Sequence, residues 1–104
     1  MILSLIQTSQ NRRAELIRFV ESLNKQQGID LSSIQLIFVD QEDNKDVFDN
    51  LSKNIEFTYI KYHHCSLSNA RNIALQHVKG QFVGFPDAGC WYEPDTLLKA
   101  LFYL

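Results

Sequence analysis

Two aspartates in the sequence directly follow apolar runs, which is where an α/β protein commonly places a ligand-binding carboxylate. Asp40 follows the run "LIFV", and Asp87 follows "FVGFP". A carboxylate at a strand end can accept hydrogen bonds from a ribose hydroxyl or a base edge. It can also cap its own turn by accepting backbone N–H groups. For Asp40 both interpretations stay open.

Arg71 is the residue best suited to bind an anion. It lies about three residues into a helix that we expect to begin at Ser68. Free N–H groups at the start of a helix attract anions, and a guanidinium can grip phosphate oxygens or stack on a base. The alternative is an exposed Arg71 that pairs with a carboxylate such as Asp40 or Asp87.

Asp87 is also the candidate ligand for a metal ion. Mg²⁺ or Mn²⁺ bound to phosphates is commonly held by one or two carboxylates, and a D-x-D pair can share this task. The second position of such a pair is Gly89 here, which has no side-chain ligand. The sequence therefore predicts a weakened metal site at Asp87.

The histidines and cysteines do not form a zinc pattern. His63 and His64 are adjacent, and Cys65 and Cys90 do not belong to a C-x-x-C motif. We expect polar loop histidines and two buried thiols. His77 falls on the apolar face of the predicted helix, which indicates a core or boundary histidine.

The hydrophobic pattern predicts alternating strands and helices. Continuous apolar runs are typical of strands buried on both faces, and they cover residues 2–6, 34–39, 56–60 and 82–85. Helices are expected between Asn11 and Gly28, around residues 47–51, between Ser68 and Gly80, and from Pro94 or Asp95 onward.

This order predicts a single α/β domain over residues 1–104, with a mainly parallel sheet in a three-layer α/β/α arrangement. Right-handed crossovers favour the Rossmann-like strand order 3-2-1-4. Ligands of such sheets bind at the carboxyl ends of the strands, where the strand order reverses. Thr8, Asp40, His63 and Asp87 follow the four strands in turn, so we expect them along that edge.

Composition excludes several classes of protein. The chain has 104 residues, is 45% apolar and carries a formal net charge of −2. It has no basic run for nucleic acid and no apolar segment of membrane-spanning length. Two cysteines fit a reducing compartment, so we expect a cytoplasmic protein. The apolar residues 101–104 predict a truncated C-terminal end through which the chain could self-associate.

Several stretches together resemble the nucleotide-binding half of the inverting family 2 glycosyltransferases, which have the GT-A fold. "ILSLIQTSQNR" is similar to the family's first strand and P-T-Y-N-R-like turn, with the proline and tyrosine replaced. "LIFVDQEDNKD" is similar to V-D-D-G-S-x-D. "SLSNARNIALQHVKGQFVGFPDAGCWYEPDTL" is similar to the G-x-S-x-A-R-N helix and the D-x-D strand that follows it.

The resemblance implies a donor-binding segment for a nucleotide-diphosphate sugar, most simply a UDP-sugar, in polysaccharide biosynthesis. Asp40 matches a nucleoside-binding aspartate, and Thr8 borders the same pocket. Arg71 matches the arginine of the nucleotide site, and Asp87 matches the first aspartate of D-x-D. The family uses Mn²⁺ or Mg²⁺, and its usual direct metal ligand aligns with Gly89.

The activity that the resemblance implies is transfer of the sugar to an acceptor hydroxyl with inversion. The family's catalytic base comes from sequence beyond these elements, so we expect the 104-residue chain to bind donor and to be inactive alone. Gly89 motivates an alternative, a non-catalytic GT-A-like domain that binds a nucleotide or a partner. A phospho-acceptor signalling domain is a third hypothesis, but "QTSQ" supplies no acidic residue after the first strand.

Overall fold

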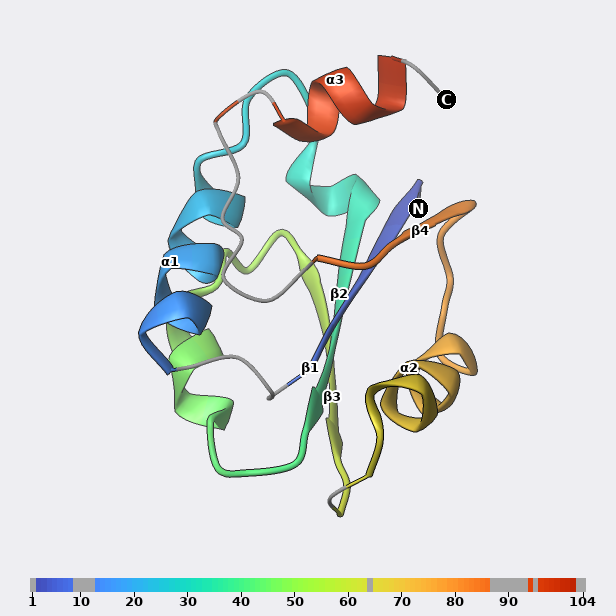
Figure 1. Cartoon of the computed structure of the whole chain (residues 1–104). Helices are drawn as coiled ribbons and strands as arrows, with labels where there is room; N and C mark the ends of the chain where they lie inside the picture. The colour runs from blue at the N-terminus through green and yellow to red at the C-terminus, as the bar shows by residue number, and fades with distance from the viewer. Residues whose placement is uncertain (1, 9–12, 64, 87–93, 95, 103–104) are drawn as a thin grey trace.

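The computed structural model describes residues 2–8, 13–63, 65–86, 94 and 96–102, with the side chains of 100–102 left out of the description. Within these residues, four parallel strands form a sheet in the order β3-β2-β1-β4 (Figure 1). The strands are β1 (Leu3–Thr8), β2 (Ile34–Asp40), β3 (Glu56–Lys61) and β4 (Phe82–Gly84). The helices are α1 (Arg13–Asn24), η1 (Leu31–Ser33), η2 (Lys45–Asn50), α2 (Leu67–Leu75) and α3 (Thr96–Phe102).

Helices cover both faces of the sheet, so the predicted three-layer arrangement and the strand order 3-2-1-4 are confirmed. Figure 1 shows α1 on one side of the sheet and α2 on the other. Alternate residues of β1 and β2 point to opposite faces because strand side chains alternate. Leu5 and Phe38 belong to the larger core cluster with α1 and η2, whereas Ile6 and Val39 pack against α2.

The boundaries of α2 differ from the prediction. Its cap is Ser66, whose side-chain oxygen accepts the N–H of Asn69 at 3.2 Å. The prediction of Ser68 was wrong because Ser66 already satisfies this first-turn donor. The helix ends at Leu75 and not at Gly80. Gly80 instead allows a close approach to β1, since a Cβ there would lie 2.8 Å from the backbone nitrogen of Ser4.

Other element ends shift by smaller amounts. Helix α1 stops at Asn24, and Gly28 lies in the loop beyond it with a φ of 77° that favours glycine. The predicted short helix around 47–51 is a 3-10 helix, and its Val47 and Phe48 are buried as expected. Strand β4 ends at Gly84, and α3 begins at Thr96. Asn11 lies outside the described residues.

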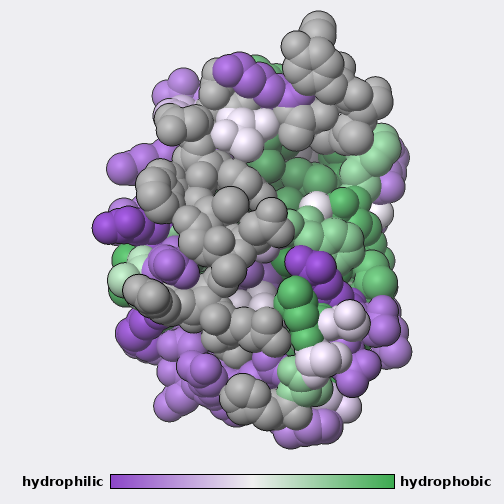
Figure 2. Space-filling view, viewed as in Figure 1, coloured by the Kyte–Doolittle hydropathy of each residue, from purple (hydrophilic) through white to green (hydrophobic). Residues whose placement is uncertain are grey.

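Strand β4 has β1 on one side and presents apolar side chains to solvent. Phe82 and Val83 of β4 are exposed, and so is Phe85 just after the strand. Ile2, whose carbonyl accepts the N–H of Phe82 at 3.0 Å, is exposed as well. Figure 2 shows hydrophobic surface gathered on the side of the molecule where β4 lies. The self-association predicted for residues 101–104 depends on side chains outside the described part. No described helix combines the length and hydropathy that crossing a bilayer requires.

A buried polar network fastens the turn before β4 to the sheet. Gln35 is fully buried on β2, and its Oε1 accepts from the Ser4 hydroxyl at 2.7 Å and the Lys79 N–H at 3.0 Å. Its Nε2 donates to the Thr58 hydroxyl and the His77 carbonyl. One carboxamide therefore joins strands β1, β2 and β3 to the segment that leads into β4.

Replacing Gln35 with leucine is expected to lower the free energy of unfolding by about 1–3 kcal/mol, because several buried groups lose their partner at once. Urea denaturation followed by circular dichroism measures the change. Gln76→Leu is the matched control, since Gln76 is exposed at the end of α2. Equal stability of Gln35→Leu and the unmodified protein would contradict this assignment.

Candidate functional site

The carboxyl ends of the strands bring two of the predicted residues to one edge of the sheet. Thr8 ends β1 and Asp40 ends β2, with Thr8 opposite Val39 in the parallel register. Both residues are buried. Their side chains lie on opposite faces, since Thr8 shares the α2 face with Ile6 whereas Asp40 shares the α1 face with Phe38.

Asp40 holds the loop that follows β2. Its Oδ1 accepts the N–H of Glu42 at 3.0 Å, and its Oδ2 accepts the N–H of Asn44 at 3.0 Å. The Tyr59 hydroxyl donates to the same Oδ2 at 2.8 Å. The side chain is fully buried. Asp40 therefore caps the turn that follows β2, which is one of the two interpretations of this residue.

Tyr59 on β3 completes this arrangement. Burial, followed by the hydrogen bond to Asp40 and the charge of that carboxylate, raises the pKa of Tyr59 to about 12. The phenol consequently stays protonated and donates to Asp40 throughout the physiological range. The Lys45 ammonium lies 5.0 Å from the centroid of the Tyr59 ring. Tyr59 of β3 thus stabilises the loop after β2 through Asp40 and Lys45.

Arg71 is in the middle of α2, at its fifth residue, and is not in the first turn as predicted. The shift follows from the earlier cap at Ser66. Its guanidinium carbon lies 4.8 Å from the centroid of the Phe85 ring, just after β4. None of the ion pairs among the described residues includes Arg71. A partly buried cation therefore lies near the carboxyl end of β4, beside Phe85, which precedes Asp87 by two residues.

Asp87 and Gly89 lie outside the described residues, as do His64 and Cys90. The predicted metal ligand is therefore not placed. In the described part of the chain, no group of three His, Cys, Asp or Glu side chains could hold a metal ion. These residues alone do not form a metal centre.

The remaining histidines and cysteine of the prediction have separate surroundings. His63 is exposed, and its ring lies tilted against that of Tyr62, with ring centroids 4.0 Å apart. Cys65 is half-buried, and its Sγ accepts from Gln41 Nε2 at 3.0 Å. A small hollow of about 220 Å³ adjoins them, lined also by side chains of α2. His77 is exposed beyond the end of α2, so its prediction as a core or boundary histidine was wrong.

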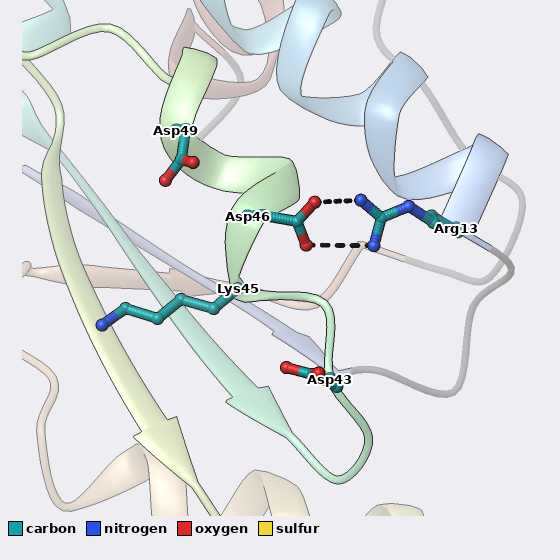
Figure 3. A pocket seen from close by; sticks show the side chains of 5 residues that line it. All are labelled: Arg13, Asp43, Lys45, Asp46 and Asp49. Carbon is teal, nitrogen blue, oxygen red and sulfur yellow. Dashed lines mark hydrogen bonds and ion pairs between the residues drawn. The ribbon is translucent and has the colours of Figure 1, made fainter.

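A larger hollow lies on the α1 side, next to the loop that Asp40 holds. Arg13, Asp43, Lys45, Asp46 and Asp49 line it, with a volume of about 650 Å³ (Figure 3). Arg13 and Asp46 form a two-pronged ion pair there, which lowers the pKa of Asp46. Lys45 points away from this pair. Three carboxylates against two cations make the hollow unfavourable for phosphate.

Gln7 is a residue at this edge that the sequence analysis missed. It precedes Thr8 in β1, is 2% exposed, and its Oε1 accepts the Thr8 N–H at 3.1 Å. Its buried Nε2 has no hydrogen-bond partner among the described residues. The signal available in the sequence was a glutamine inside an otherwise largely apolar strand.

The chain is similar to known proteins in its fold and in its sequence. The chain has the GT-A, Rossmann-like fold of three crystal structures of S. aureus TarS. The first is TarS residues 1–349 with UDP, which has a TM-score of 0.85 and 20% identity and covers 99% of this chain and 32% of that chain. The second is TarS residues 1–349 with UDP-GlcNAc, which has a TM-score of 0.83 and 20% identity and covers 99% of this chain and 31% of that chain. The third is a structure of TarS with a TM-score of 0.81 and 22% identity, and the match covers 99% of this chain and 19% of that chain.

The sequence profile described as "Glycosyl transferase family 2" matches residues 4–104, and the chain therefore belongs to that family. The comparison with curated proteins found no match. The chain spans about a third or less of the length of the TarS structures that it resembles.

Proposed function

We propose that this chain is the donor-binding segment of a glycosyltransferase that uses a nucleoside-diphosphate sugar, most simply a UDP-sugar. Membership of glycosyl transferase family 2 over residues 4–104 carries the proposal. The likeness to TarS solved with UDP and with UDP-GlcNAc supports this choice of donor. The nucleotide would bind at the carboxyl edge of the sheet, where the order reverses between β1 and β4.

The named residues have different tasks in this proposal. Thr8 borders the nucleoside from the end of β1, while Asp40 acts as a positioning residue that holds loop 41–44. Arg71 stabilises the diphosphate, because its guanidinium lies beside Phe85 and close to the end of β4. Asp87 follows β4 and is the proposed ligand for a divalent cation.

The proposed reaction is a single displacement at the anomeric carbon of the sugar. An acceptor hydroxyl attacks that carbon, a carboxylate base takes the hydroxyl proton, and the bond to the nucleoside diphosphate breaks with inversion. The leaving diphosphate takes the bonding electron pair, and Arg71 offsets part of the negative charge that develops. A bound Mn²⁺ or Mg²⁺ supplies further neutralisation of the departing phosphates. We assign the base to no residue of this chain and expect no transfer by the chain alone.

A second candidate function rests on Gly89. A non-catalytic member of the family could bind a nucleotide or a partner and need no second metal-binding aspartate. Titration with UDP, with and without Mn²⁺, tests both functions. Binding of UDP supports a nucleotide site, whereas an absence of binding at millimolar UDP contradicts the donor-binding proposal and leaves the partner-binding function.

Replacing Arg71 with alanine is expected to weaken UDP binding by about 10–100-fold, since a charged hydrogen bond contributes about 1.5–3 kcal/mol. Calorimetric titration at moderate salt measures the change. Lys53→Ala is the control for the loss of a positive charge, because Lys53 is exposed in the turn before β3, at the amino end of the strand. Equal losses for the two variants would indicate a general charge effect and contradict the role of Arg71.

A further inference from the structure

Gln7 carries a buried hydrogen-bond donor that the fold does not use. The side chain is fixed at one end, since its Oε1 accepts the Thr8 N–H at 3.1 Å. This bond engages Oε1 and leaves Nε2 as the other polar atom of the carboxamide. Nε2 is buried and has no partner within the described part of the chain. Buried donors are nearly always paired in native proteins, so an unpaired one calls for an explanation.

The fold uses the oxygen of this carboxamide and not its NH₂ group. Gln7 shares the α1 face with Leu3 and Leu5, which are core residues, and lies opposite Phe38 in the register. An apolar side chain would continue this row, but it would take the acceptor away from the buried Thr8 N–H. The fold thus accounts for the oxygen of this carboxamide, while an unused donor at its other atom is typical of a residue retained for binding.

The position of Gln7 indicates what it would bind. It is the penultimate residue of β1, at the carboxyl edge where ligands of parallel sheets bind. Two residues beyond Phe38, on the same face, lies Asp40, whose two carboxylate oxygens already accept three protein donors. Both oxygens of Asp40 are therefore engaged in holding its loop. On the same face, the Nε2 of Gln7 is a donor that no described residue uses.

The charges around Gln7 favour a neutral oxygen over a phosphate as the acceptor for Nε2. The buried Asp40 carboxylate and the acidic side chains of the adjoining hollow repel an anion on the α1 face. The cation suited to a diphosphate, Arg71, lies beside the end of β4 on a helix that covers the other face. A pyrimidine base offers neutral carbonyl oxygens, each an acceptor that a carboxamide N–H can reach.

We propose that Gln7 is a specificity-determining residue that donates from Nε2 to a carbonyl oxygen of the nucleobase. The inference deepens the proposed nucleotide site and rests on it. Since Nε2 is covered in the ligand-free protein, the base must displace the atoms over it. The hydrogen bond that forms offsets part of that cost and satisfies the donor.

The test compares Gln7→Leu with the unmodified protein in its thermal stability and in its affinity for two ligands. Ligand-free Gln7→Leu should melt near the temperature of the unmodified protein, because it loses the stranded Nε2 donor and also the acceptor of the Thr8 N–H. Its affinity for UDP should fall roughly tenfold, the value of one hydrogen bond to a ligand. Its affinity for inorganic pyrophosphate, which has no base, should not change. Gln7→Glu should also bind UDP more weakly, because its carboxylate accepts and does not donate.

Gln35→Leu is the control, as Gln35 is a buried carboxamide whose atoms are paired. It should melt at a lower temperature and bind UDP within about twofold of the unmodified protein. If Gln7→Leu binds UDP as tightly as the unmodified protein, or loses UDP and pyrophosphate equally, the role of Gln7 is overturned and the donor site stands. If the unmodified protein binds no UDP, the donor site itself fails, and the inference fails with it.

Discussion

Replacing Asp40 with asparagine is expected to lower the free energy of unfolding by about 2–4 kcal/mol. The carboxylate accepts the N–H groups of Glu42 and Asn44 and the hydroxyl of Tyr59, and it is fully buried. An asparagine keeps one oxygen and turns an NH₂ group toward a donor, so a charged hydrogen bond is lost and a buried donor is stranded. Loop 41–44 should loosen, and UDP binding should weaken with it. Chemical denaturation measures the change in stability.

Tyr59→Phe is the matched comparison, since it removes the hydroxyl and keeps the ring in its cluster with Phe38 and Phe57. It should lower the free energy of unfolding by only about 1 kcal/mol, as one hydrogen bond is lost and the other two remain. The sum of the two effects should exceed that of the double variant, because both act on the same oxygen. A stable, UDP-binding Asp40→Asn protein would contradict the positioning role of Asp40.

Restoring the second aspartate with Gly89→Asp is expected to raise UDP affinity in the presence of Mn²⁺ by at least 10-fold. A direct carboxylate ligand should matter no less than the partners that orient metal ligands, whose loss commonly costs 10–100-fold in metal affinity. Bridging of the diphosphate and protein by the cation would transmit this gain to the nucleotide. Calorimetric titration with UDP, with Mn²⁺ and with EDTA, measures the difference.

Gly89→Ala is the control for this prediction, because it adds a side chain without a ligand. It should show no dependence on Mn²⁺ beyond that of the unmodified protein. A gain in UDP affinity for Gly89→Asp that persists in EDTA would show that the new carboxylate acts without metal. Unchanged binding in Mn²⁺ would indicate that the site has lost its metal-dependent role at other positions too.

The strand order and layers were predictable because continuous apolar runs and helical spacing alternate along the chain. Residues such as Ile6 and Ile37 must be buried on a sheet covered from both sides, and few topologies permit this. The helix boundaries were less predictable. Both Ser66 and Ser68 are capable caps, and only the packing of α2 on the sheet through Ala70 and Ala74 decides between them.

The edge of the sheet where Thr8 and Asp40 lie was predictable, and the surroundings of these two side chains were not. Residues that follow strands gather at the carboxyl edge in any parallel sheet, so Thr8 and Asp40 could be placed there. The register and the alternation of side chains decide which face each occupies, and these depend on contacts between strands. The bond from Tyr59 to Asp40 spans 19 residues, and the stranded donor of Gln7 is visible only when its surroundings are packed.

The most direct test of the proposed nucleotide site is a two-dimensional amide NMR titration of the protein with UDP. Binding at the proposed site should shift signals at the carboxyl ends of β1, β2 and β4, around Gln7, Thr8, loop 41–44 and Phe85, and should also perturb the Arg71 side chain. Shifts confined to the amino ends of the strands or to the hollow beside Arg13, with the carboxyl ends unchanged, would contradict it.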